Sequence, residues 1–300
     1  MKLSDTAIGH ISAAVAYIFF GFNILSCRAI ATSGFFTPVD VFTLRSVGAT
    51  LLFWLASAFM PKEKVDIKDF PKIFAASMLG FYLCQIVFLA AVEITTPFDC
   101  AIVASLTPIF TMIIAAIAIH EPITVKKCSG VLLSFIGVLT LIFNTTHSGG
   151  AVATQPKGIL LMLCNGICFA LYLGIFKPLI TKYSVVTFMK WIFLFSTLMS
   201  LPFSASHLIR VDYTAIPTNI ISDLMFTIIC ATFFSYFLIP VAQQRIRPTL
   251  VSLYSYLQPM ITAAVGIYVG MDSLTILKVI AAILVFTGVA IVQTSRTAKS

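Results

Sequence analysis

Apolar residues occur in ten long runs that short polar or charged stretches separate. Each run holds about 20 residues, the length that an α-helix needs to cross the hydrocarbon core of a bilayer. The pattern therefore predicts ten transmembrane helices. They are expected at residues 8–29, 38–60, 71–92, 98–119, 126–144, 157–178, 184–204, 221–242, 248–270 and 275–293.

From Pro97 onward the sequence repeats at a constant spacing of 151 residues. The recurring residues include Pro97 and Pro248, Leu106 and Leu257, Pro108 and Pro259, Thr124 and Thr275, and Gly137 and Gly288. Two copies of one apolar unit are typical of transporters built from structural repeats. We therefore expect two repeat units at 1–147 and 148–300, joined through the polar stretch 144–156.

Composition places the chain in lipid. Hydrophobic residues make up 59% and charged residues 10%, whereas an ordinary soluble domain has about 25% charged residues. The mean hydropathy is +1.04. Because lipid offers no hydrogen-bond partners to the backbone, the class expected is an all-α membrane protein. The net charge of +8 does not indicate nucleic acid, since the basic residues lie in short loops between apolar runs. All seven cysteines lie in or beside those runs, which argues against a disulfide framework.

The Lys and Arg distribution predicts the orientation. With the N-terminus in the cytoplasm, thirteen basic residues fall on the cytoplasmic side and four on the other. We therefore expect a multi-pass protein of a bacterial inner membrane with both termini cytoplasmic and no cleaved signal peptide. Five spans per unit is an odd number, so the second unit is expected to be inverted, with a cavity at the unit interface near midplane.

Several short motifs recur in the same order in both halves. They are Ala104–Pro108, Glu121–Thr124, Gly130 and Gly137 in the first, and Ser255–Pro259, Asp272–Thr275, Ala281 and Gly288 in the second. Together with Leu44-Arg45 in the second span, they resemble the EamA module of the drug/metabolite transporter superfamily. The resemblance covers essentially the whole chain. It implies ten helices and export or exchange of small metabolites, often amino acids.

Arg45 is the leading candidate for a functional side chain. It lies inside the second span, and a cation within a membrane span is a functional-site hypothesis by default. Two interpretations stay open: contact with substrate or a gate, and structural pairing with an acid such as Asp40 or Asp99. Lys190 occupies a similar depth in the seventh span, where snorkelling to the headgroups is the favoured interpretation.

Polar and aromatic residues near midplane are the other candidates for substrate binding. They share helix faces in pairs: Tyr82 with Gln85, Asn165 with Tyr172, and Tyr254 with Gln258. As a group they predict a neutral, aromatic-lined cavity. The alternative for each residue is an interhelical hydrogen bond.

Pro108 and Pro259 occupy equivalent positions near the middle of the fourth and ninth spans. A helical proline frees the carbonyl four residues back, so both are candidate hinges, with simple kinks as the alternative. Gly130, Gly137 and Gly288, together with the GxxxG formed by Gly266 and Gly270, are interpreted as helix-packing positions, either within the chain or between protomers.

No carboxylate is expected at midplane, which argues against a proton-coupled cation antiporter. The function expected is alternating-access export or exchange of a small neutral or zwitterionic, amino-acid-like metabolite. Alternatives are a carrier of anions such as sugar phosphates or nucleotide sugars, and a non-transporting membrane scaffold. The sequence has no HExxH, GxSxG or acid-rich motif, so we expect neither an enzyme nor a metal or cofactor. The expected partners are substrate and lipid, in a monomer or homodimer.

Overall fold

The computed structural model describes residues 4–107, 109–110, 113–114, 124–147, 154–243, 245–246, 254, 257–271 and 274–294. Within these ranges every regular element is a helix. Six stretches are long and apolar enough to cross a membrane: Asp5–Thr32, Pro38–Ala58, Ile67–Glu93, Pro156–Phe176, Val185–Leu208 and Thr218–Ala242. The predicted class, a helical membrane protein, therefore fits the structure.

The first half begins with α1 (Asp5–Thr32) and α2 (Pro38–Ala58). The third predicted span is one continuous stretch made of η1 (Ile67–Asp69), α3 (Phe70–Ser77), the π-helical η2 (Met78–Leu83) and α4 (Cys84–Glu93). It is followed by α5 (Pro97–Ala104) and α7 (Val125–His147). Thr37 begins α2 through a capping box with Asp40, and Thr96 caps α5.

The second half contains α8 (Pro156–Lys182) and α9 (Val185–Leu208). Its next stretch is α10 (Thr218–Ile228), the π-helical η3 (Ile229–Phe234) and α11 (Ser235–Gln243). The last two helices are α13 (Leu257–Tyr268) and α14 (Ile276–Thr294). Predicted spans 98–119 and 248–270 lie partly outside the described residues.

The two π-helical segments were not predicted. Each inserts one extra residue per turn into an apolar helix, a feature frequent at functional sites. Met78–Leu83 and Ile229–Phe234 are separated by the same 151 residues as the sequence repeat. The structural irregularity therefore recurs at the repeat spacing, although the residues of the two segments themselves differ.

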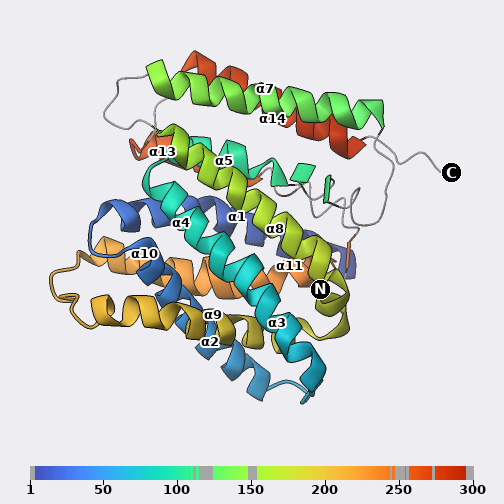
Figure 1. Cartoon of the computed structure of the whole chain (residues 1–300), viewed down its shortest axis with the longest axis vertical. Helices are drawn as coiled ribbons and strands as arrows, with labels where there is room; N and C mark the ends of the chain where they lie inside the picture. Colours follow the sequence, from blue (N-terminus) through green and yellow to red (C-terminus); the bar gives the residue numbers. More distant parts are fainter. Residues whose placement is uncertain are drawn as a thin grey trace.

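The helices lie side by side in a bundle that α7 and α14 close at one edge and α2 and α9 at the other (Figure 1). Between these pairs, α1 packs on α10, α11 and α13, and α4 packs on α8. Both edge pairs are antiparallel. Thr43 and Thr50 of α2 meet Ser204 and Thr197 of α9 in that reverse order.

Glycines bring α7 and α14 into backbone contact, which confirms the predicted packing role at this pair. A Cβ placed on Gly130 would lie 2.5 Å from the carbonyl oxygen of Gly288, and one on Gly137 would lie 2.9 Å from that of Ala281. Such close approach is open only to small residues. The order of these contacts shows that α7 and α14 are also antiparallel.

The interpretation of Gly270 as a packing residue is wrong. Its φ is +74°, and a Cβ there would meet nothing within 4 Å. The Met271 N–H bonds the Gly266 carbonyl, and the Gly270 N–H bonds that of Ile267. This pattern is a Schellman motif, so Gly270 ends the helix through a left-handed conformation that glycine adopts readily.

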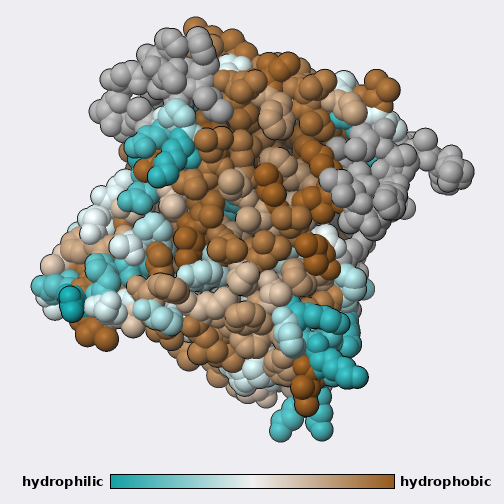
Figure 2. Space-filling model, viewed as in Figure 1, coloured by the Kyte–Doolittle hydropathy of each residue, from teal (hydrophilic) through white to brown (hydrophobic). Residues whose placement is uncertain are grey.

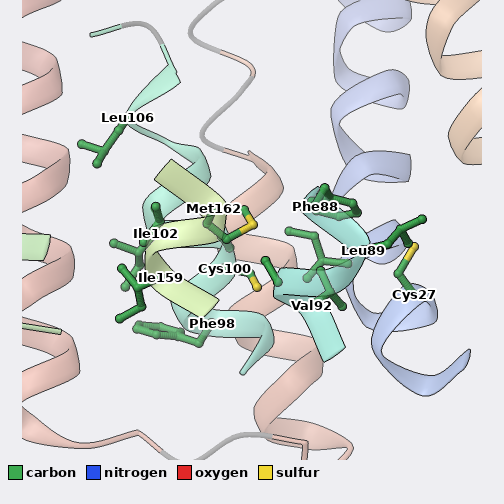
Figure 3. Packing of buried hydrophobic residues seen from close by; sticks show 14 of the residues in the cluster. Cys27, Phe88, Leu89, Val92, Phe98, Cys100, Ile102, Leu106, Ile159 and Met162 are labelled. Carbon is green, nitrogen blue, oxygen red and sulfur yellow. The ribbon is translucent and has the colours of Figure 1, made fainter. Parts of the chain in front are cut away.

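The apolar surface forms a broad band between polar groups on two opposite flanks (Figure 2). Beneath it, the largest core cluster lies where α4 and α5 pack against α1 and α8. Figure 3 shows part of it, with Cys100 and Ile102 of α5 beside Ile159 and Met162 of α8. An apolar exterior over a close-packed interior is the arrangement expected of a protein dissolved in lipid.

Candidate functional site

A small, partly open cavity lies between helices of the two halves. The space inside it that a water-sized sphere can occupy is about 10 Å³, which is room for about one water molecule. This is below the roughly 300–1,000 Å³ of sites for drug-sized ligands. The lining residues are Phe42, Arg45, Ser46, Phe81, Gln85, Phe193, Thr232 and Tyr236.

Arg45 provides the charge of this cavity. It is only 4% exposed. Its Nε donates to Thr232 Oγ1 at 3.0 Å and its Nη1 to Gln85 Oε1 at 3.2 Å, while Cys27 Sγ lies 3.9 Å from Nη1. Among the described residues no carboxylate oxygen comes within 4.0 Å of the guanidinium. Arg45 is thus a buried cation held by neutral groups, an expensive arrangement in a low dielectric.

The nearby acids have other partners. Asp40 accepts from the Thr37 backbone N–H and hydroxyl, and its carboxylate lies 2.8 Å from His207 Nδ1. Asp223 accepts a 2.7 Å hydrogen bond from Ser26. The interpretation of Arg45 as the partner of an acid therefore finds no support in the described part of the chain.

The π-helical segment η3 places the acceptor that Arg45 uses. In this segment Thr232 Oγ1 donates to the Thr227 carbonyl, five residues back. The Thr232 hydroxyl hydrogen is used in this bond, and a lone pair on Oγ1 remains to accept a hydrogen bond from Arg45 Nε. Phe81 of η2 lines the same cavity. The two irregular segments therefore both contribute to this site.

Two of the predicted site residues, Arg45 and Gln85, meet in the cavity, whereas three others lie beside it. Tyr82 packs its ring on Phe42 at 5.7 Å. Asn165 donates to the Cys84 carbonyl at 2.8 Å and so acts as an interhelical hydrogen bond. Tyr172 packs edge-to-face on Phe81 at 5.4 Å and is buried behind it.

The other predicted site residues lie away from the cavity. Tyr254 pairs its hydroxyl with His10 Nδ1 at 2.9 Å. The Gln258 backbone lies against Gly21 of α1, and Gln258 is not among the lining residues. Lys190, the span cation for which snorkelling was expected, also lies away from the cavity: it donates to Ser57 Oγ at 2.8 Å, and its Nζ lies 5.1 Å from the centre of the Trp54 ring.

The structure describes only one of the two proposed hinge prolines. Pro259 is buried in α13, whereas Pro108 lies outside the described residues. The carbonyl of Ala104, which a proline at 108 would free, accepts a 2.7 Å hydrogen bond from Thr107. A neighbouring hydroxyl thus satisfies this carbonyl locally.

Six lining residues were absent from the predicted site. They are Phe42, Ser46, Phe81, Phe193, Thr232 and Tyr236. The repeat spacing carried a usable signal, because Phe81 and Thr232, like Gln85 and Tyr236, are 151 residues apart. Applying that spacing to Gln85 would have pointed to Tyr236.

Two polar clusters lie at opposite ends of α8. At one end Asp69 accepts hydrogen bonds from Lys182 and from the Tyr183 hydroxyl. At the other end Asp99 lies 3.6 Å from Lys278 Nζ and also binds the Thr154 hydroxyl. The 27 residues of α8 separate the clusters by about 40 Å. In the described part of the chain no group of three His, Cys, Asp or Glu residues could hold a metal ion.

Comparison with known proteins supplies a family. The sequence model of the EamA-like transporter family matches residues 7–143 and again 156–294. An uncharacterized transporter of Archaeoglobus fulgidus is 26% identical over 268 residues, covering 87% of this chain and 91% of that protein. The uncharacterized transporter YyaM of Bacillus subtilis is 24% identical over 275 residues, with 86% and 85% covered. One solved crystal structure shares the fold with a TM-score of 0.61 at 15% identity, covering 96% and 95% of the two chains.

Proposed function

The chain belongs to the EamA-like transporter family, and from this premise we propose that it exports or exchanges a small neutral or zwitterionic metabolite, resembling an amino acid, by alternating access. The observation that carries the proposal is the buried Arg45 in a cavity between the two halves. A buried cation without a carboxylate partner among the described residues is costly to retain unless a ligand uses it. A substrate carboxylate would offset that cost.

We propose an inverted arrangement of two five-helix units for this function. Contacts between the halves support it: α2 packs on α9, α5 on α13 and α7 on α14, each joining corresponding spans. The first span packs on the eighth while the third packs on the sixth, which is the reciprocal exchange that a two-fold axis requires. The antiparallel run of α2 with α9 and of α7 with α14 supports inversion.

The end clusters support alternating access. The stretch Ile67–Glu93 carries Asp69 at its start, and Asp99 follows shortly after its end. The cavity residues Phe81 and Gln85 lie between these two points. An occluded intermediate requires contacts that close both ends of the bundle and a small cavity between them. Opening of one end at a time would then expose the cavity to one side of the membrane.

The charge of the cavity favours this substrate class over the anionic alternative. Sugar phosphates and nucleotide sugars carry two or more negative charges and would need several cations. Of the two span cations considered, only Arg45 lines the cavity, because Lys190 is directed to Ser57 and Trp54. We further propose an inner-membrane location with both termini cytoplasmic, from the distribution of Lys and Arg.

A metabolite-profile comparison followed by reconstitution tests this function. Cells with and without the protein are compared by mass spectrometry, and solutes that differ are loaded into proteoliposomes for uptake and exchange measurements. We expect saturable flux that Arg45→Ala reduces while membrane insertion is unchanged. Absence of flux for every such solute would favour a non-transporting scaffold.

A further inference from the structure

We propose that this cavity is a carboxylate site that makes no use of a substrate ammonium group, so that deaminated acids bind at least as well as the corresponding amino acids. The inference rests on the proposed function and narrows its substrate class. It predicts small monocarboxylates with an apolar, flat body. It is based on those hydrogen-bond donors and acceptors of the lining residues that have no partner among the described residues.

One nitrogen of the Arg45 guanidinium, Nη2, is available to a ligand. Its Nε and Nη1 are bound to Thr232 and Gln85, but Nη2 makes no hydrogen bond with any residue that the structure describes. The side chain is 96% buried and lines the cavity. The N–H groups of Nη2 can donate charge-assisted hydrogen bonds to a carboxylate oxygen.

Gln85 adds donors beside the guanidinium. Arginine has no acceptor, so the amide atom that faces Arg45 Nη1 must be the Gln85 oxygen. The amide nitrogen then points away from Arg45, and it has no hydrogen-bond partner within the described ranges of the chain. Two neutral N–H groups thus lie next to the charged ones, which is a suitable environment for an oxyanion.

The hydroxyl groups supply little for an ammonium group. Thr232 Oγ1 already accepts from Arg45, and Ser46 Oγ donates to the Thr43 carbonyl, which leaves only the hydroxyls of Ser46 and Tyr236 as neutral acceptors. None of the lining residues is acidic. A second cation beside Arg45 would be repelled in a low dielectric without an anion to compensate it. The site therefore stabilises the carboxylate of a ligand but does not stabilise its ammonium group.

Aromatic rings define the remaining wall. Phe81 and Phe193 pack edge-to-face at 5.3 Å, and Phe81 and Tyr236 also lie 5.3 Å apart. Phe42 lines the same space. Such rings accommodate a flat hydrocarbon body through stacking and edge contacts. The cavity as it stands has room for about one water molecule, so such a body enters only when the surrounding helices move apart, as alternating access requires.

Four ligands with one carbon skeleton test the inference: 3-phenylpropanoate, phenylalanine, phenethylamine and 3-phenylpropan-1-ol. Binding to the detergent-solubilised full chain is measured by calorimetric titration at constant ionic strength. We expect 3-phenylpropanoate to bind at least as tightly as phenylalanine. The amine and the alcohol should bind at least about tenfold more weakly, because each lacks the charge-assisted hydrogen bonds.

Two variants and a matched control test whether ligand binding depends on Arg45 and Gln85. Arg45→Gln should weaken 3-phenylpropanoate binding by about ten- to a hundred-fold, whereas Lys190→Gln, which removes the other span cation outside the cavity, should leave it unchanged. Gln85→Glu should abolish carboxylate binding and raise thermal stability, since an internal carboxylate then pairs with Arg45. This second variant gives a result even if Arg45→Gln fails to fold.

Three results would overturn the inference: phenylalanine binding about tenfold or more tightly than 3-phenylpropanoate, equal binding of the amine or alcohol, or no binding of any ligand. Proteoliposome flux separates this failure from that of the proposed function. If phenylalanine is transported but 3-phenylpropanoate is not preferred, the proposed transport function stands and only the inference of a carboxylate site fails. Tight carboxylate binding without flux of any solute removes the transport proposal.

Discussion

Replacing Gly288 with alanine should separate α14 from α7. A Cβ at this position would lie 2.2 Å from Ser134 Oγ and 2.4 Å from the carbonyl oxygen of Gly130. The serine side chain can rotate, but the carbonyl belongs to a helix backbone. To restore a separation of at least 3.0 Å, the closest distance seen for real Cβ contacts, the helices must move apart by at least about 0.6 Å.

That movement weakens the contacts along the whole pair, since dispersion falls steeply with separation. Overpacking of this kind costs about 1–3 kcal/mol. Alanine also gains about 1 kcal/mol over glycine in helix propensity. The expected net change is therefore a destabilisation of up to about 2 kcal/mol.

The assay is thermal unfolding in detergent, followed with a maleimide dye that becomes fluorescent on reaction with the buried thiols of Cys27, Cys84 and Cys100. Gly174→Ala in α8 is the matched control. Its new Cβ would meet no backbone atom and only the Cγ2 methyl of Ile114, at 2.9 Å, so a shift of about 0.1 Å restores 3.0 Å and the propensity gain should dominate. We expect Gly288→Ala to lower the melting temperature and Gly174→Ala to maintain or raise it. Equal shifts in the two variants would refute the close backbone contact between α7 and α14.

Thr232→Val should weaken 3-phenylpropanoate binding by about tenfold, because the hydrogen bond that orients the Arg45 guanidinium is lost; titration that gives the wild-type affinity would contradict this role. Asp69→Asn should open the end of the bundle that it closes and raise the rate at which an impermeant maleimide labels buried thiols from that side, whereas an unchanged rate would show that the contact closes nothing. Burial opposes ionisation of the Glu63 carboxyl, but hydrogen bonds from Ser184 outweigh it and hold its pKa below the usual value. Its stabilisation is present above the unfolded pKa of about 4.3 and is lost as pH falls through the lower folded value, so the melting temperatures of Glu63→Gln and the wild type should differ at pH 7 and converge below pH about 4. A difference independent of pH would exclude this explanation.

Helix positions were largely predictable. Hydrophobic run length alone located the six stretches that can cross a membrane, because lipid requires each backbone to satisfy its own hydrogen bonds. The packing role of Gly130, Gly137 and Gly288 was predictable as well, since small residues at repeated spacing have few other uses in lipid, but the pairing of α7 with α14 was not. The π-helical segments were not, because a single extra residue per turn changes neither composition nor apparent periodicity.

The candidate site was predictable only in part. Arg45 and Gln85 were found because a charge or amide inside a span is rare. Asn165 and Tyr254 carry the same kind of signal, yet they bind the Cys84 carbonyl and His10. Helical spacing indicates which residues share a face, but it does not indicate which neighbouring helix that face meets.

Local chemistry along the chain thus specified a helical, lipid-embedded, duplicated protein with a buried cation, because each of these properties follows from run length, composition and repeat spacing. The composition of the cavity depended on packing between the halves. Phe81 of η2 and Thr232 of η3 come from spans distant in sequence, and they meet because the helices of one half pack against those of the other. Contacts between distant segments leave no periodic trace along the chain, so the acceptor of Arg45 could be identified only in three dimensions.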